Sequence, residues 1–361
     1  MAGTAQTEFG SVHQGALPPG AALPFGTRPA RQDWLALSDK GLIDPWANPF
    51  RDMAMGTFVA ELRLPLPRAK VLINLQSNHG VARSFGLFVG PDGGLSLLHR
   101  DGMAVQRVTL PAPLAASGDT ARLSFRFDAV AKTWAMRLES LDNVAPTSHA
   151  SGIGSLAFAN GDVDDICKKA AVDPAVLWFG FCRSVELPRA APWIGLRTPI
   201  ETQKGWIAAA HLKAGDMIVT QDRGPLPLRA VHRVDLPARG SFAPVLLRGP
   251  FYDPRGDLLV SADQRIAMTG SAVEYLFGTD AVLVAARDVV DGHTALAEDR
   301  RHVISAVSLD LGVSALIGGN GSLGLAMGDF AQSGDAPLMC LNSFETVALM
   351  RMMGRVVSRV A

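Results

Sequence analysis

Short runs of alternating apolar and polar residues follow one another through the first half of this chain, roughly 8–15 residues apart. Between about residues 56 and 188 they include GTFVAELRLPL, KVLINLQS, SFGLFVG, QRVTL and ARLSFRFDA. A period of two is typical of strands with one buried face, and PDGG at 91–94 favours a hairpin turn. Roughly seven or eight antiparallel strands with this spacing predict a β-sandwich.

The second half, from residue 193 to about 343, is again composed of short apolar runs such as GDMIVTQ, PVLLRG and AVLVAA. It follows PRAAPW at 188–193, whose two prolines favour a joint between domains. A length of 361 residues fits two domains, and 36 glycines with 23 prolines argue against an all-α fold. The chain is therefore predicted to be all-β with two domains.

The two ends of the chain differ from these strand-rich parts. We predict an extended Pro/Gly-rich arm over 1–50, a sandwich over 51–188, a second β-domain over 193–343 and a helix over 344–361. The helix is predicted because apolar residues recur there every three or four positions, which makes it amphipathic. A second face of that helix carries a row of arginines: Arg351, Arg355 and Arg359.

Charge and cysteine content exclude several classes of function. Lys plus Arg equals Asp plus Glu at 34 each, so nucleic acid is not an expected partner. Cys167, Cys182 and Cys340 form neither a disulfide framework nor a zinc pattern. No apolar stretch is long enough to span a membrane, and no signal peptide is predicted. Cytoplasmic residence and leaderless export both stay open.

The second half carries four strings that point to one family when they are taken in order. They are TPIET at 198–202, HLKAGDMIVTQDRGPLPLRAVHRV at 211–234, DLLVSADQRIAM at 257–268 and EYLFGTDAVLVAARDVVDG at 274–292. In this order they resemble the bacterial Hint domain, the β-rich module shared by hedgehog autoprocessing domains and inteins. The strand order of the first half resembles the concanavalin/laminin-G jelly roll. The two resemblances imply a jelly-roll-like β-sandwich followed by a Hint-type β-fold with a C-terminal helix.

Active Hint domains cleave their own backbone, and the resemblance shows which residues hold the reactive positions here. A Cys or Ser at the first position attacks the preceding carbonyl, and the His of a T-x-x-H element protonates the scissile amide. The first position carries Trp193, five residues before Thr198, and the T-x-x-H element reads Ser261 to Gln264. An indole cannot attack a carbonyl, and an amide does not titrate near neutral pH, so it cannot act as a general acid. The resemblance therefore implies a degenerate Hint domain that is not an enzyme.

Three hypotheses for function follow. The leading one is a non-catalytic binding or assembly module, in which the sandwich binds a protein or a glycan. The second is residual self-cleavage at the 192–198 joint, with Thr198 as nucleophile and Asp263 as general base. The third is a structural component of a larger particle or secreted appendage, suggested by the proline-rich arm.

Two further motifs have ordinary interpretations. GNGSLG at 319–324 fits a dinucleotide-binding pattern but lacks the βαβ context, so we expect a glycine-rich loop and no cofactor. The segment NGDVDD groups oxygen ligands that calcium favours, although an acidic loop is the preferred interpretation because the spacing differs from an EF-hand. These weak calcium candidates are Asn160, Asp162, Asp164 and Asp165.

Overall fold

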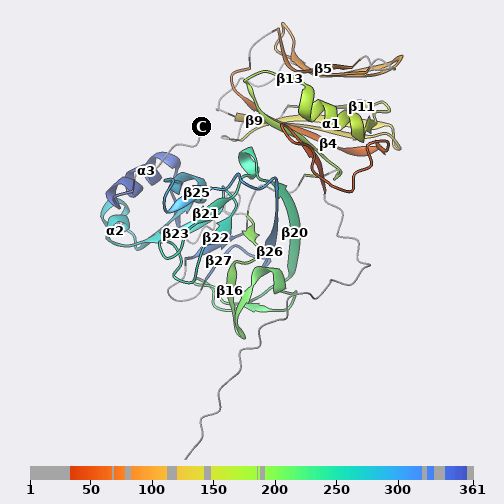
Figure 1. The fold of residues 1–361 in the computed structure, drawn as a ribbon. Coiled ribbons are helices and arrows are strands. Elements are labelled where there is room, and N and C mark those ends of the chain that lie inside the picture. The colour runs from red at the N-terminus through yellow and green to blue at the C-terminus, as the bar shows by residue number, and fades with distance from the viewer. Residues whose placement is uncertain are drawn as a thin grey trace, which may run out of the picture. The chain divides into compact units, whose positions relative to one another are not determined.

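The computed structural model describes most of the chain beyond its first 32 residues. The described ranges are 33–66, 69–77, 83–111, 120–141, 148–184, 186–187, 192–318, 323–328 and 338–355. Within them the fold is mostly β, as predicted, with three α-helices (Figure 1). No helix in these ranges is long and apolar enough to cross a membrane.

The first half is a sandwich of two antiparallel sheets. In sheet order, the first sheet contains β11 (Ser148–Ile153), β10 (Thr133–Ser140), β9 (Thr120–Asp128), β4 (Met55–Arg63), β14 (Val176–Cys182), β1 (Trp34–Leu37) and β2 (Gly41–Leu42). The second contains β13 (Ala171–Val172), β5 (Lys70–Ser77), β6 (Arg83–Val89), β7 (Leu95–Asp101) and β8 (Ala104–Leu110). A separate short pair joins β3 (Asp52–Met53) to β12 (Phe158–Ala159).

Aromatic side chains from both sheets fill the space between them. Phe58 on β4 lies 5.3 Å from Phe85 on β6 and 5.1 Å from Phe181 on β14, measured between ring centroids. Phe158 lies 5.5 Å from Phe181, and all four rings are buried. Because these residues occupy the inward positions of alternating strands, the sequence pattern produces one continuous apolar core.

The first half differs from the sequence predictions in two places. Strands β1 and β2 lie within the predicted arm over 1–50, because the apolar segment WLAL pairs with β14 and is buried; residues 1–32 lie outside the described ranges. The NGDVDD segment is not a loop but begins helix α1 (Asn160–Lys169). Lysines one turn later pair with two of its aspartates, and such i,i+4 pairs favour a helix.

The second half contains three further sheets. The six-stranded sheet contains β20 (Ala230–Pro237), β26 (Val303–Asp310), β15 (Ile194–Gly195), β22 (Leu258–Val260), β21 (Val245–Leu247) and β25 (Ala295–Ala297). The four-stranded sheet contains β17 (Gly205–Ala208), β16 (Pro199–Thr202), β18 (Met217–Ile218) and β19 (Leu226–Pro227). The five-stranded sheet contains β27 (Ala315–Ile317), β28 (Leu325–Met327), β23 (Arg265–Thr269), β24 (Ala281–Ala285) and β29 (Met339–Cys340).

Short helices complete this half. They are α2 (Ser271–Phe277), α3 (Ser343–Met352) and the 3-10 turns η1 (Ala209–His211), η2 (Gly240–Phe242) and η3 (Ala286–Val289). Helix α3 confirms a C-terminal helix, and a capping box between Asn342 and Glu345 fixes its start. It ends at Met352, earlier than the predicted 344–361, and Arg359 lies outside the described ranges.

A separate apolar cluster joins the two halves of the chain. Trp34, Trp178 and Phe242 contact one another, with ring centroids 6.0–6.1 Å apart, and Phe242 comes from the second half. The indole N–H of Trp34 donates to the backbone oxygen of Asp235 on β20 at 3.1 Å. We call this the joint cluster; its buried members are Trp34, Leu37, Val59, Trp178, Cys182, Trp193, Leu236, Ala238, Phe242, Ile304 and Ala306.

Candidate functional site

Strand β15 positions the residue that holds the nucleophile position in the Hint resemblance. β15 pairs with β22 on one side and β26 on the other, which places Trp193 beside Ser261 at the end of β22. The backbone N–H of Trp193 donates to the Ser261 hydroxyl at 3.4 Å, and the Ser261 N–H donates to the Trp193 carbonyl at 3.1 Å. The amide that an active domain would cleave is therefore held by hydrogen bonds.

Gln264, which the Hint resemblance places at the histidine position, is fully buried. Its backbone N–H donates to the Ser261 carbonyl at 3.0 Å, which closes a tight turn. Its side-chain Nε2 donates to the carbonyls of Ala326 at 2.5 Å and Arg265 at 3.1 Å. Its Oε1 has no hydrogen-bond partner among the described residues. The side chain is fixed by hydrogen bonds to two backbone acceptors, and an amide cannot act as a general acid at neutral pH.

The indole of Trp193 is 1% exposed and belongs to the joint cluster. That cluster contains apolar side chains from both halves of the chain, among them Trp178 of β14 and Leu236 of β20. The position that would hold a reactive thiol therefore contributes instead to the packing between the sandwich and the second half.

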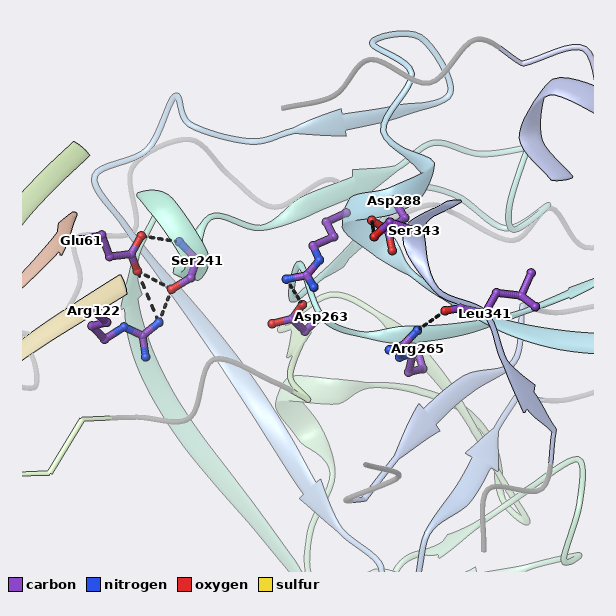
Figure 2. A network of polar contacts seen from close by, with 9 residues as sticks. Glu61, Arg122, Ser241, Asp263, Arg265, Asp288, Leu341 and Ser343 are labelled. Carbon is purple, nitrogen blue, oxygen red and sulfur yellow. Dashed lines mark hydrogen bonds and ion pairs between the residues drawn. The ribbon is translucent and has the colours of Figure 1, made fainter. Parts of the chain in front are cut away.

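The other two candidate residues, Asp263 and Thr198, do not join Trp193, Ser261 and Gln264 in one site. Asp263 turns to the surface, where its Oδ1 lies 2.6 Å from Nη1 of Arg287 (Figure 2). Thr198 is buried, and its backbone N–H donates to Gly195 at 3.0 Å. Its side chain lines a small cavity whose walls include none of Trp193, Ser261 and Gln264.

Two hydrogen bonds near Gln264 could not be predicted from sequence patterns. Arg265 donates from Nη1 to the Leu341 carbonyl at 3.0 Å, and Ser343 donates to Asp288 at 2.9 Å (Figure 2). The first bond connects β23 to the segment before α3, and the second connects the start of α3 to η3. No local sequence pattern indicates these bonds, because their partners lie 76 and 55 residues apart.

Two of the three cysteines are buried and offer no substitute nucleophile. Burial raises the pKa of the Cys182 thiol to about 12, and burial also raises the pKa of Cys167. Both therefore stay protonated near neutral pH, and a thiol is a poor nucleophile. Cys340 is exposed on β29.

The weak calcium candidates are engaged in other contacts. Asp162 pairs with Arg83 at 2.9 Å, and Asn160 donates to the Asn48 carbonyl at 2.8 Å. Asp164 pairs with Lys168 at 2.9 Å and Asp165 with Lys169 at 2.7 Å. In the ranges that the structure describes, no group of three or more His, Cys, Asp or Glu side chains could hold a metal ion.

A buried ion pair next to the joint cluster was not predicted. Glu61 on β4 and Arg122 on β9 lie 3.4 Å apart, with side chains 1% and 8% exposed. Glu61 also accepts from the backbone N–H of Ser241 at 2.9 Å and from its hydroxyl (Figure 2). Arg122 lies over the Phe242 ring at 4.3 Å.

Gly240 permits the approach of Ser241 to this pair. Its φ is +51°, and a Cβ there would lie 1.8 Å from Oε2 of Glu61 and 2.1 Å from Nε1 of Trp178. A side chain at this position would therefore strain the backbone and displace the side chains of Glu61 and Trp178.

The comparisons with known proteins identify one part of the chain. Residues 196–317 match the family model of the Hint domain. No curated protein matches the chain.

Several solved structures have weak similarity. A CBM40 module of a Ruminococcus gnavus IT-sialidase, bound to alpha2,6 sialyllactose, is 15% identical over 37% of this chain and 79% of its own, with a TM-score of 0.27. The MchDnaB-1 intein is 15% identical over 36% of this chain and 98% of its own, with a TM-score of 0.23. At these TM-scores, neither structure bears on the fold or function of this chain.

Proposed function

Because residues 196–317 form a Hint domain, we propose that this chain uses the fold without its self-cleaving reaction, as a rigid module for binding or assembly. The observation that carries the proposal is the burial of Trp193 in the joint cluster. A reactive side chain must reach the preceding carbonyl, whereas this one packs between two parts of the chain.

The chemistry at the two reactive positions supports the same conclusion. The acyl shift needs a nucleophile that a base can deprotonate and an acid that can protonate the leaving amide nitrogen. The Trp193 indole supplies no nucleophile. At the acid position, both N–H groups of the Gln264 amide are directed at backbone carbonyls. The Ser261 hydroxyl still contacts the amide nitrogen, so the module keeps the backbone arrangement but lacks the reacting groups.

The sandwich offers a surface on which a partner could bind. Trp46 and Phe50 lie on the segment between β2 and β3 and are 73% and 93% exposed. Their backbone N–H groups donate to the side chains of Asp44 at 3.0 Å and Asn48 at 2.9 Å, which fixes the segment. Exposed aromatic rings on a fixed backbone favour contact with a sugar ring or an apolar protein surface. This supports a lectin-like role for the sandwich, with a glycan or a protein as ligand.

Residual self-cleavage by Thr198 remains the competing proposal, and one observation favours it. The Thr198 hydroxyl is buried and has no hydrogen-bond partner among the described residues, as an unused nucleophile would. Its proposed base, Asp263, is paired with Arg287 at the surface, which weighs against the mechanism. A role as a structural component depends on the N-terminal arm, most of which lies outside the described ranges.

We expect the purified chain to keep its full mass of 38.2 kDa after one day at neutral pH with an added thiol. Thiols intercept the thioester of an active Hint domain, and here none can form. Intact-mass spectrometry measures this directly. Two fragments meeting within residues 192–198 would contradict the proposal. A Thr198→Ala variant would then show whether Thr198 is the nucleophile.

A further inference from the structure

A small cavity lies in the Hint domain, where the β16–β17 hairpin approaches the loop before β22. Its polar and aromatic lining comes from Thr198, Glu201, Trp206, Asp253 and Arg255. Aliphatic side chains such as Ile200 and those of β27 and β28 supply the rest of the walls. Its free volume is about 10 Å³, which is room for the centre of one group the size of a water molecule.

Two polar atoms at this cavity are buried without a partner. They are Oγ1 of Thr198, a residue only 2% exposed, and Oε2 of Glu201. Neither has a hydrogen-bond partner within the ranges that the structure describes. A buried carboxylate oxygen without a donor is unfavourable, so the arrangement favours a ligand that donates hydrogen bonds.

The nearby positive charge does not compensate Glu201. Arg255 donates from Nε to Oδ1 of Asp253 at 2.8 Å, and its Nη2 contacts the second oxygen of the same carboxylate. The guanidinium also lies over the Trp206 ring, 3.6 Å from its centroid. Because Arg255 is paired with Asp253, the half-buried carboxylate of Glu201 has no cationic partner in the ranges that the structure describes, and the cavity favours a cation.

We propose that this cavity binds a primary alkylammonium group, such as a lysine side chain or a free chain N-terminus. An ammonium is close to a water molecule in size and has three donors, which suits one carboxylate oxygen and one hydroxyl. A quaternary ammonium has no N–H to donate to these two oxygens, and a planar guanidinium is wider than an ammonium. The methylenes of the ligand would lie against the aliphatic walls and along Trp206, which is 43% exposed. The proposal does not depend on whether the Hint domain cleaves itself.

The test uses the full chain labelled with 5-fluorotryptophan and titrated with n-butylammonium, followed by fluorine NMR. The Trp206→Phe variant identifies the signal of Trp206 among the six tryptophans. We expect that signal to shift saturably, with n-butanol and guanidinium causing no such shift. Glu201→Gln should weaken binding roughly tenfold or more, since it removes the charge. Thr198→Val, which keeps the shape and removes the hydroxyl, should weaken it severalfold.

Glu274→Gln is the matched control, because Glu274 is an exposed carboxylate on α2 of the same domain. This variant should bind n-butylammonium as the parent chain does. Acetyl-lysine methylamide, with a free side-chain amine, and alanine methylamide, with a free N-terminus, distinguish the two sources of the ammonium. No saturable shift, an equal shift with n-butanol, or unchanged binding in both Glu201→Gln and Thr198→Val would mean that the cavity holds only water, and would overturn the proposal.

Discussion

Replacing Arg122 with leucine is expected to lower the free energy of unfolding by about 3–5 kcal/mol. Glu61 would then stay buried beside Ser241 without its cation, since only 1% of its side chain reaches solvent. The substitution would also remove the contact between the Arg122 guanidinium and the Phe242 ring. Urea unfolding at pH 7 measures the change.

Arg137→Leu is the matched control for this variant. Arg137 lies on the neighbouring strand β10, is 57% exposed and pairs with Glu139 at 3.0 Å. Exposed pairs contribute less than about 1 kcal/mol, so this variant should change the free energy of unfolding little. Equal losses in the two variants would contradict a stabilising role for the buried pair at the joint.

Replacing Trp193 with alanine is expected to cost about 3–5 kcal/mol of unfolding free energy, the usual range for a large aromatic residue removed from a core. The indole is wholly buried in the joint cluster, so its removal leaves a cavity that side chains from two domains border. The variant should gain no self-cleavage, because alanine is no more nucleophilic than tryptophan. Thermal unfolding combined with intact-mass spectrometry tests both statements.

Trp46→Ala provides the comparison for Trp193→Ala. Trp46 is 73% exposed in the sandwich, and its loss should change the free energy of unfolding by less than about 1 kcal/mol. If Trp193→Ala were as mild as Trp46→Ala, the nucleophile position would not contribute to the joint cluster as we describe.

Much of the sandwich could be predicted from sequence because its strands alternate in hydrophobicity. Strand β1 was missed because its partner β14 lies far along the chain: Leu37 pairs with Gly180, which is 143 residues away. Helix α1 was missed because an acidic cluster resembles a loop. The Asp164–Lys168 and Asp165–Lys169 spacings were a helical signal present in the sequence.

The site around Trp193 and Gln264 was predictable only in part. The order of matching strings led to Trp193 and Gln264, and the family match over 196–317 confirms the Hint domain. The membership of Trp193 in a cluster with side chains from both halves depends on how the halves meet, which no local pattern encodes. The same holds for Glu61 and Ser241, which are 180 residues apart and yet share a hydrogen bond.

The central claim is that the residue at the former nucleophile position helps to fix the two domains as one unit. Differential scanning calorimetry of the intact chain tests it most directly. We predict a single transition whose calorimetric and van't Hoff enthalpies agree, since domains joined by a shared core unfold together. Two resolved transitions, each with the enthalpy of one domain, would contradict the claim.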